Sequence, residues 1–439
     1  MKKLYYIIAL FVCSSCGDGV NLPSPGVETD LYKLPVKEDL DKLMTIKLKD
    51  KSVPMIHCGA LHTPEDFAYI RERLAEGKEP WTSGVVQLRT NSCARLDWTP
   101  NPQRILERFS NGGNYTIAMK DVAAAYQCAL RYNLGDGEEY AQKSIEILRA
   151  WADKCTAIGG DSNSALAAGL YGYQFAVTGE LMRDYWMEKE PDAFKRYQQW
   201  TVDVFYPVNY AIAIEYWGMP PFHYWANWHL CNLASMLATG ILADRRDIYN
   251  QAVQQLQTGE GSGRMTHAIY HVYTAEEEGG KYAQYANLAQ WQENGRDVGH
   301  TKLCQGLMGV ICQLTWNQGD DFFGYNDNMY LKGCEYNGRM WTAKLEVPYI
   351  PYVRVYQGPW GIAEHISDIL ASKDDANGAG SIWALAYYHY AKIKGLPAEK
   401  YQYTKMGMEV SMPEGGPNGS GNSGAYDQLG FGTLMYAKE

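Results

Sequence analysis

The sequence has little positive charge, and it lacks motifs that accompany several common functions. Its 439 residues contain 40 lysines and arginines against 50 aspartates and glutamates, which gives a formal net charge of −10. Proteins that bind nucleic acid through its phosphates need a basic surface, so we expect no nucleic-acid partner. Neither of the two common glycine-rich phosphate-binding loops is present.

Metal-binding patterns are also missing. Two of the ten cysteines lie near the N-terminus, and the other eight are scattered without metal-ligand spacing, so we expect mostly buried thiols in helices. The stretch HAIYH at 267–271 places two histidines four residues apart. It lacks the glutamate of a zinc protease, and no third ligand is placed by the sequence. We therefore predict no metal and no cofactor.

A long apolar run occurs only at the N-terminus. There, Lys2 and Lys3 precede LYYIIALFV, which is too short to span a bilayer, and then CSSC. Cys16, followed by Gly17 and Asp18, resembles the acceptor cysteine of a bacterial lipoprotein. Residues 1–16 are thus predicted to be a lipoprotein signal, with a plainly cleaved signal as the alternative. We expect an exported protein, lipid-anchored in the periplasm or at the outer membrane or cell surface, that contacts membrane only through the anchor.

Alternating β patterns are nearly absent between residues 60 and 395, where helical periodicity dominates. DVAAAYQCALRYNL and EEYAQKSIEILRAWADKC flank GDG as a helical hairpin, and similar segments recur along the chain. We predict a tether over 17–53 and, over 54–400, an all-α domain of stacked helical hairpins. Its architecture is an incomplete or complete (α/α) toroid. Residues 401–439 are predicted to form a short irregular or β tail packed on the toroid.

Aromatic residues make up 13% of the chain, with 34 tyrosines and 13 tryptophans. Several gather near expected helix ends, as in YWGMPPFHYWANWH at 216–229. Flat apolar rings with polar edges suit sugar binding, although tyrosine also packs well between helices. Composition is therefore compatible with a glycan ligand, but packing of the rings between helices also explains it.

Two polar clusters begin two of the predicted helices. The first contains Asn227, Trp228 and His229, and the second contains Gln290, Glu293, Arg296 and His300. Arg296 and His300 are four residues apart and would share a face in the first turns of a helix, where unpaired N–H groups attract anions. The alternative is that Arg296 pairs locally with Glu293 while the histidine caps the helix.

Several stretches, in the same order, resemble one family. They are HTPEDFAYIRERLAEGKEPW, NW at 227–228, QENGRD with His300, NQGDDFFGYNDNMYLKGCEY and AYDQLGFGTL. Over residues 54 to about 435 the chain resembles the alginate-lyase superfamily of polysaccharide lyases, and within it the Bacteroidetes enzymes that act on alginate or glucuronan. The resemblance implies an α/α toroid that binds an anionic polysaccharide, such as alginate, polymannuronate or glucuronan. It also implies cleavage by β-elimination to 4,5-unsaturated uronides.

Carrying the family's site onto this chain gives named candidates. In the family an asparagine and a histidine open one helix, and a catalytic tyrosine follows near an arginine. Here Leu303 occupies the nearest equivalent place after Arg296, so we prefer Tyr285 over Tyr282, with Tyr173 and Tyr273 as outsiders. The expected catalytic residues are Tyr285, His229, Arg296 and His300, and the expected substrate-binding residues are Asn227, Trp228, Gln290, Glu293, His267 and Tyr173.

Two other classes stay open. An inverting glycoside hydrolase on an α/α barrel needs two carboxylates across a cleft, and Glu293 offers one of them. A noncatalytic glycan-binding surface lipoprotein would need the aromatic residues without the clustered arginine and histidine.

Overall fold

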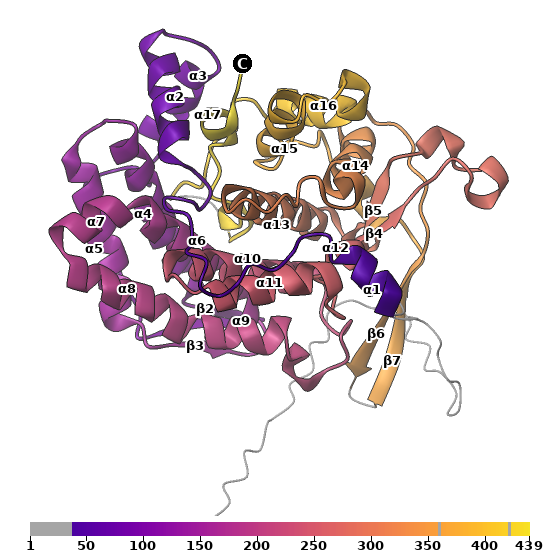
Figure 1. Ribbon diagram of the computed structural model, residues 1–439, viewed down its shortest axis with the longest axis horizontal. Helices are drawn as coiled ribbons and strands as arrows, with labels where there is room; N and C mark the ends of the chain where they lie inside the picture. Colours follow the sequence, from indigo (N-terminus) through magenta and orange to yellow (C-terminus); the bar gives the residue numbers. More distant parts are fainter. Residues whose placement is uncertain (1–36, 359–360, 420–422) are drawn as a thin grey trace, which may run out of the picture.

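The structure, a computed structural model, describes residues 37–439 except 359–360 and 420–422 (Figure 1). The predicted signal and Cys16 lie outside the described residues. The helices are α1 Lys37–Leu43, α2 Pro64–Ala75, α3 Trp81–Arg89, α4 Tyr115–Asn133, α5 Glu138–Lys154, α6 Ser164–Leu181, α7 Arg183–Lys189, α8 Pro191–Val204, α9 Tyr206–Ala213, α10 Ala226–Leu242, α11 Arg246–Thr258, α12 Met265–Ala268, α13 Val298–Asn317, α14 Tyr325–Trp341, α15 Ala384–Tyr388, α16 Gln402–Ser411 and α17 Gly432–Tyr436. The strands are β1 Ile105–Phe109, β2 Gly112–Gly113, β3 Ala157–Gly160, β4 Ile269–Val272, β5 Ala289–Trp291, β6 Tyr352–Gly358 and β7 Gly361–Ser367.

Helices α6 and α10 form the centre of the fold, and nearly every residue of both is buried. A helix that is apolar on all sides must be surrounded by others, and α10 packs against α6, α9, α11 and α13. Glycines let α6 and α10 approach closely. An added Cβ at Gly169 would come within 2.3 Å of Cys231 Sγ, and one at Gly172 within 2.3 Å of Ser235 Oγ.

Helices farther out bury only one stripe. On α5 the buried residues include Ala141, Ile145, Leu148 and Trp151, at the three- and four-residue spacing of a single helix face. The α4–α5 hairpin packs against α6, and α5 also contacts α8 (Figure 1). This arrangement of helical hairpins confirms the predicted α/α toroid.

Three small sheets interrupt the helices, and two of them bear on the site. Strand β1 pairs in parallel with β3, with Ile105 opposite Ala157 and Arg108 opposite Gly160. Strands β4 and β5 form an antiparallel pair that leads into α13. The antiparallel hairpin β6–β7 projects from the helical body (Figure 1). Strands β1 to β5, of two to five residues, are too short to produce a clear alternating pattern in the sequence.

The C-terminal tail is helical where it is regular. The sequence predicts an irregular or β tail over 401–439. In the described part of this range no strand forms, and the regular elements are the helices α16 and α17. Helix α17 packs against α2, α3 and α15, and its Leu434 is fully buried with the preceding Phe431. Burial of these apolar side chains therefore fixes the tail to the body.

The described cysteines are all free, and all but Cys58 are buried, which confirms the expectation of buried thiols. Among the described residues, no group of three His, Cys, Asp or Glu side chains is placed to hold a metal ion. His267 and His271 have separate partners, the Gly261 carbonyl and Glu277. No helix within the described ranges is long and apolar enough to cross a membrane.

An ion cluster holds the start of the domain to the toroid. His57 Nδ1 lies 2.6 Å from Glu180 Oε1, and His57 Nε2 lies 2.6 Å from Asp244 Oδ1. Arg183 also pairs with Glu180, at 2.8 Å. Burial acts to lower the pKa of His57, but its hydrogen bonds to Asp244 and Glu180 raise it to about 9, so the ring is a cation at neutral pH.

This cluster should make stability depend on pH. Because the pKa of His57 in the folded protein exceeds its value of about 6.5 in the unfolded chain, the stabilisation is complete below about pH 6.5. It is lost as pH rises through about 9. We expect the wild-type melting temperature to fall across this range and His57→Gln to flatten the fall. Thermal melts at a series of pH values test this, and equal falls in both proteins would exclude His57 as the cause.

Candidate functional site

A cavity of about 730 Å³ opens where the chain brings together β1, α6, the first turns of α10 and α13, and the C-terminal tail. Its size falls in the range of ligand pockets. The charged and amide side chains that line it are Arg108, Asn227, Asp297, His300, Lys302, Asp427 and Gln428.

Asp297 and His300 form a dyad at the start of α13. Asp297 has an extended backbone and caps the helix, since its Oδ1 accepts the His300 backbone N–H at 2.8 Å. Its other oxygen, Oδ2, lies 2.6 Å from His300 Nδ1. Burial acts to raise the pKa of Asp297, but the hydrogen bonds from His300 outweigh it and lower the pKa to about 2.

The dyad fixes which ring nitrogen of His300 is free to react. An ionised carboxylate only accepts hydrogen bonds, so Nδ1 must carry the proton that it shares with Asp297. In the neutral ring, Nε2 is then unprotonated and can accept a proton. Asp297 therefore orients His300 as a general base, in the way that a carboxylate orients histidine in other enzymes.

Asn227 is held by a buried carboxylate. Its Nδ2 donates to Glu293 Oε1 at 2.6 Å, and its backbone N–H donates to the same oxygen at 3.3 Å. Arg296 Nη1 lies 3.5 Å from the other oxygen of Glu293 and balances its charge. Asn227 lines the cavity, and Glu293 engages one of the two hydrogens on its Nδ2.

The prediction that Glu293, Arg296 and His300 begin one helix is wrong. Helix α13 begins at Val298, and Glu293 lies before it in the 3₁₀ turn η4, Gln292–Gly295. Arg296 ends that turn, and the extended Asp297 separates it from His300. Arg296 instead lies over the Trp225 ring, 5.2 Å from its centre, and pairs with Glu293 as the local alternative expected.

His229 and His267 lie away from the cavity. His229 is 1% exposed, and its ring stacks on that of Tyr216, with 5.6 Å between the ring centres. Side chains two residues apart on a helix point in different directions, so His229 does not share the orientation of Asn227. Burial lowers the pKa of His229 to about 3 and that of His267 to about 4. Both rings are therefore neutral at pH 7, and neither lies where it could donate to a ligand in the cavity.

Gln290 and Trp228 have structural contacts instead of cavity positions. Gln290 is in β5, not at a helix start, and its side chain bonds the backbone N–H and carbonyl of Ile350 at 2.9 and 2.8 Å. Trp228 stacks on Tyr224, 5.1 Å away. The stack joins the first turn of α10, which contains Trp228, to the aromatic loop before it, which contains Tyr224.

The structure does not bring Tyr285 to the cavity. Its ring lies 5.3 Å from the Arg339 guanidinium, and its chain neighbours Gln284 and Ala286 line a different pocket with that arginine. The hairpin β4–β5 turns the segment toward α14. Tyr173 is buried on α6, where its hydroxyl donates to the Asp427 carbonyl at 2.9 Å.

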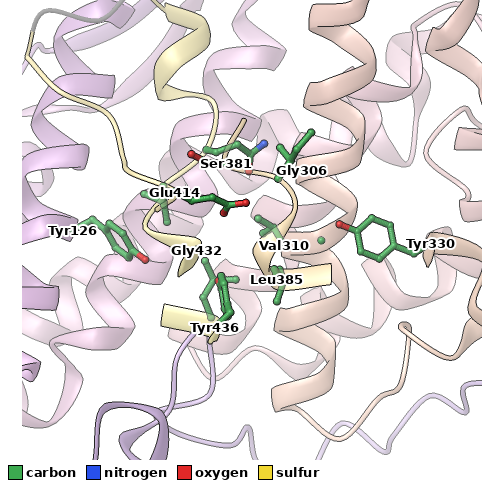
Figure 2. A pocket seen from close by; sticks show the side chains of 15 residues that line it. Tyr126, Gly306, Val310, Tyr330, Ser381, Leu385, Glu414, Gly432 and Tyr436 are labelled. Carbon is green, nitrogen blue, oxygen red and sulfur yellow. The ribbon is translucent and has the colours of Figure 1, made fainter. Parts of the chain in front are cut away.

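A second, enclosed cavity of about 40 Å³ lies deeper in the protein (Figure 2). Glu414 points into it, above Tyr436 in this view, and its carboxylate accepts the backbone N–H groups of Trp383 and Ala384. Burial raises the pKa of Glu414 to about 7. This space admits about one water molecule and is too small for a sugar.

The sequence interpretation misses five of the seven charged and amide residues that line the cavity, namely Arg108, Asp297, Lys302, Asp427 and Gln428. Asp297 was treated as part of a helix, although an aspartate three residues before a helical N–H is a typical cap. Arg108 lies on a short strand in a stretch without clear periodicity, and Asp427 follows a Gly/Ser-rich segment. The stretch AYDQLGFGTL, which contains Asp427, carries part of the family resemblance, but the resemblance assigns no site residue there.

No family model and no curated protein matches this chain. Solved structures do. Alginate lyase A1-III from Sphingomonas species A1 aligns with a TM-score of 0.52 and 14% identity over 90% of this chain and 99% of that chain. Alginate lyase A1-III with one histidine replaced by alanine, complexed with tetrasaccharide, aligns with a TM-score of 0.54 and 13% identity, over 90% of this chain and 98% of that chain. An alginate lyase from Bacteroides ovatus aligns with a TM-score of 0.53 and 12% identity, over 88% of this chain and 100% of that chain. At these identities the likeness is one of fold, and this chain has the α/α-toroid fold of those alginate lyases.

Proposed function

We propose that this protein is a polysaccharide lyase that cleaves a uronate-containing glycan by β-elimination. The observation that carries the proposal is one cavity lined by His300, oriented by the ionised Asp297, and by Asn227, fixed by Glu293. The toroid shared with alginate lyases supports the same reaction class. Alginate, polymannuronate and glucuronan are the polymers that the sequence resemblance suggests.

The reaction requires charge stabilisation and proton removal at adjacent atoms. Taking the proton from C5 of a uronate builds negative charge on the attached carboxylate, which must face preorganised donors. Asn227 Nδ2 supplies one donor, and Arg108 supplies positive charge in the same cavity. His300 Nε2 accepts the C5 proton, and the electrons of the C5–H bond form the C4–C5 double bond as the C4–O4 bond breaks.

This assignment moves the base from Tyr285 to His300. A tyrosine near its ordinary pKa of about 10 is a poor base at neutral pH unless cations favour its phenolate. Tyr285 does not line the cavity that holds Asn227, and the cation near its ring, that of Arg339, lies over the ring face. His300 needs no such activation because Asp297 already presents its unprotonated nitrogen.

A glycoside hydrolase is the second candidate, because two carboxyls, Asp297 and Asp427, line the cavity. In a hydrolase one of them would have to activate water. Both oxygens of Asp297 are already bonded to His300, through its backbone N–H and its ring. This geometry favours elimination over hydrolysis.

The direct test is to incubate the purified protein with polymannuronate, polyguluronate and glucuronan. We expect ultraviolet-absorbing 4,5-unsaturated uronides from at least one polymer, at equal rates before and after exhaustive EDTA treatment. New reducing ends without the unsaturated chromophore would identify a hydrolase. Activity that vanished with EDTA and returned with calcium or zinc would contradict the metal-free mechanism, and no cleavage of any polymer would remove the proposed function.

A further inference from the structure

Asp427 lines the same cavity as His300, and buried residues of α6 fix its backbone. The Tyr173 hydroxyl donates to the Asp427 carbonyl at 2.9 Å, and Gln174 Nε2 donates to the preceding carbonyl, that of Tyr426, at 2.8 Å. Both donors are on the fully buried face of the central helix. The segment is therefore held rigidly, although it follows a Gly/Ser-rich stretch.

The Asp427 carboxyl differs from the other carboxyl of the cavity. In the described part of the chain, no hydrogen bond or ion pair engages its oxygens, whereas both oxygens of Asp297 are occupied by His300. Burial raises the pKa of Asp427 to about 7, although the charges of Arg108 and His300 act in the opposite direction. At neutral pH one cavity thus holds an ionised carboxylate, that of Asp297, and a carboxyl that is protonated in a substantial fraction of the molecules, that of Asp427.

Two titratable groups whose environments move their pKa values apart commonly act as the acid and the base of one reaction. Elimination needs both, because the sugar oxygen O4 is a poor leaving group unless it is protonated as it departs. His300 takes up a proton, so a second group must give one to O4. Glu414 has a similarly raised pKa, but it faces the small enclosed cavity and is hydrogen-bonded to backbone.

We propose that Asp427 is the general acid that protonates the departing O4, an inference that rests on the proposed lyase function. In the step, His300 Nε2 gains the C5 proton, the C5–H electrons become the C4–C5 π bond, and the C4–O4 electron pair leaves on oxygen. The Asp427 O–H proton moves to that oxygen. The products are an unsaturated uronide, a free hydroxyl, the Asp427 carboxylate and a protonated His300, and proton exchange with water restores both groups.

The test compares substrates whose leaving groups differ in their need for an acid. One is the polymer that the wild-type protein cleaves, and the other is a uronide carrying a dinitrophenoxy group at C4, whose phenolate leaves without protonation. We expect Asp427→Asn to lower turnover of the polymer about a hundredfold, within the usual range for general acid catalysis. Turnover of the dinitrophenyl uronide should fall less than about fivefold. Glu414→Gln, a second buried acid, should leave the ratio of the two activities at its wild-type value.

The outcomes separate the acid role from the lyase function. If Asp427→Asn keeps its activity on the dinitrophenyl uronide, the variant is folded and its base, His300, still removes the C5 proton. Equal losses on both substrates, or no loss on the polymer, would overturn the acid role while the wild-type protein remained a lyase. A wild-type protein that forms no unsaturated product from either substrate would overturn the lyase function itself and the inference with it.

Discussion

Replacing His300 by alanine should lower turnover about a thousandfold while leaving the fold intact, because general bases typically contribute between a hundredfold and ten-thousandfold. The ring is 37% exposed, so its removal should cost stability only about 1 kcal/mol or less. Adding imidazole to His300→Ala should restore part of the activity, since the variant leaves an opening beside the intact Asp297. Turnover and thermal melting on the same preparations measure both effects.

His271 offers a matched control for His300. It is also a partly exposed histidine, at 27%, and its Nε2 lies 2.8 Å from a carboxylate oxygen of Glu277, but it does not line the cavity. His271→Ala should keep turnover within about twofold of wild type. Tyr285→Phe should likewise remain active. If Tyr285→Phe abolished product formation while His300→Ala kept near-normal turnover, the base would be the tyrosine first expected from the sequence.

The fold could be predicted from the sequence because helical periodicity is local. Apolar residues on α5 recur at three- and four-residue spacing, and the largely apolar α6 and α10 have the composition of central helices. The short strands could not be predicted in the same way. Strand β1 is defined by pairing with the distant β3, and that register depends on tertiary structure.

The site could be predicted only in part, for a related reason. Asn227 and His300 line the cavity, as expected of donors at helix starts. The relation between Arg296 and His300 was predicted from four-residue spacing, which holds only inside a continuous helix, and Asp297 ends that continuity. Asp427 reaches the cavity through hydrogen bonds to α6, a contact that sequence spacing does not contain.

The second large effect is expected at Asn227, whose amide is aimed by Glu293 at the charge that develops on the substrate. Losing one preorganised donor typically costs about a hundredfold to a thousandfold in turnover. Asn227→Ala should therefore lower kcat by about that factor. KM should change much less, because the donor acts mainly in the transition state. Steady-state kinetics on the cleaved polymer measures the two parameters separately.

Stability must be separated from chemistry here, because Asn227 is fully buried and its loss leaves Glu293 with one partner fewer. Asn232 provides the comparison. It is also buried on α10, and its Nδ2 donates to the Trp228 and Ala165 carbonyls at 2.7 and 3.1 Å, away from the cavity. Asn232→Ala should lower the melting temperature at least as much as Asn227→Ala, while kcat of the folded protein stays within about threefold of wild type. Equal kcat losses in both variants would mean that Asn227 acts through the fold, and the carboxylate-stabilising role would have to pass to Arg108.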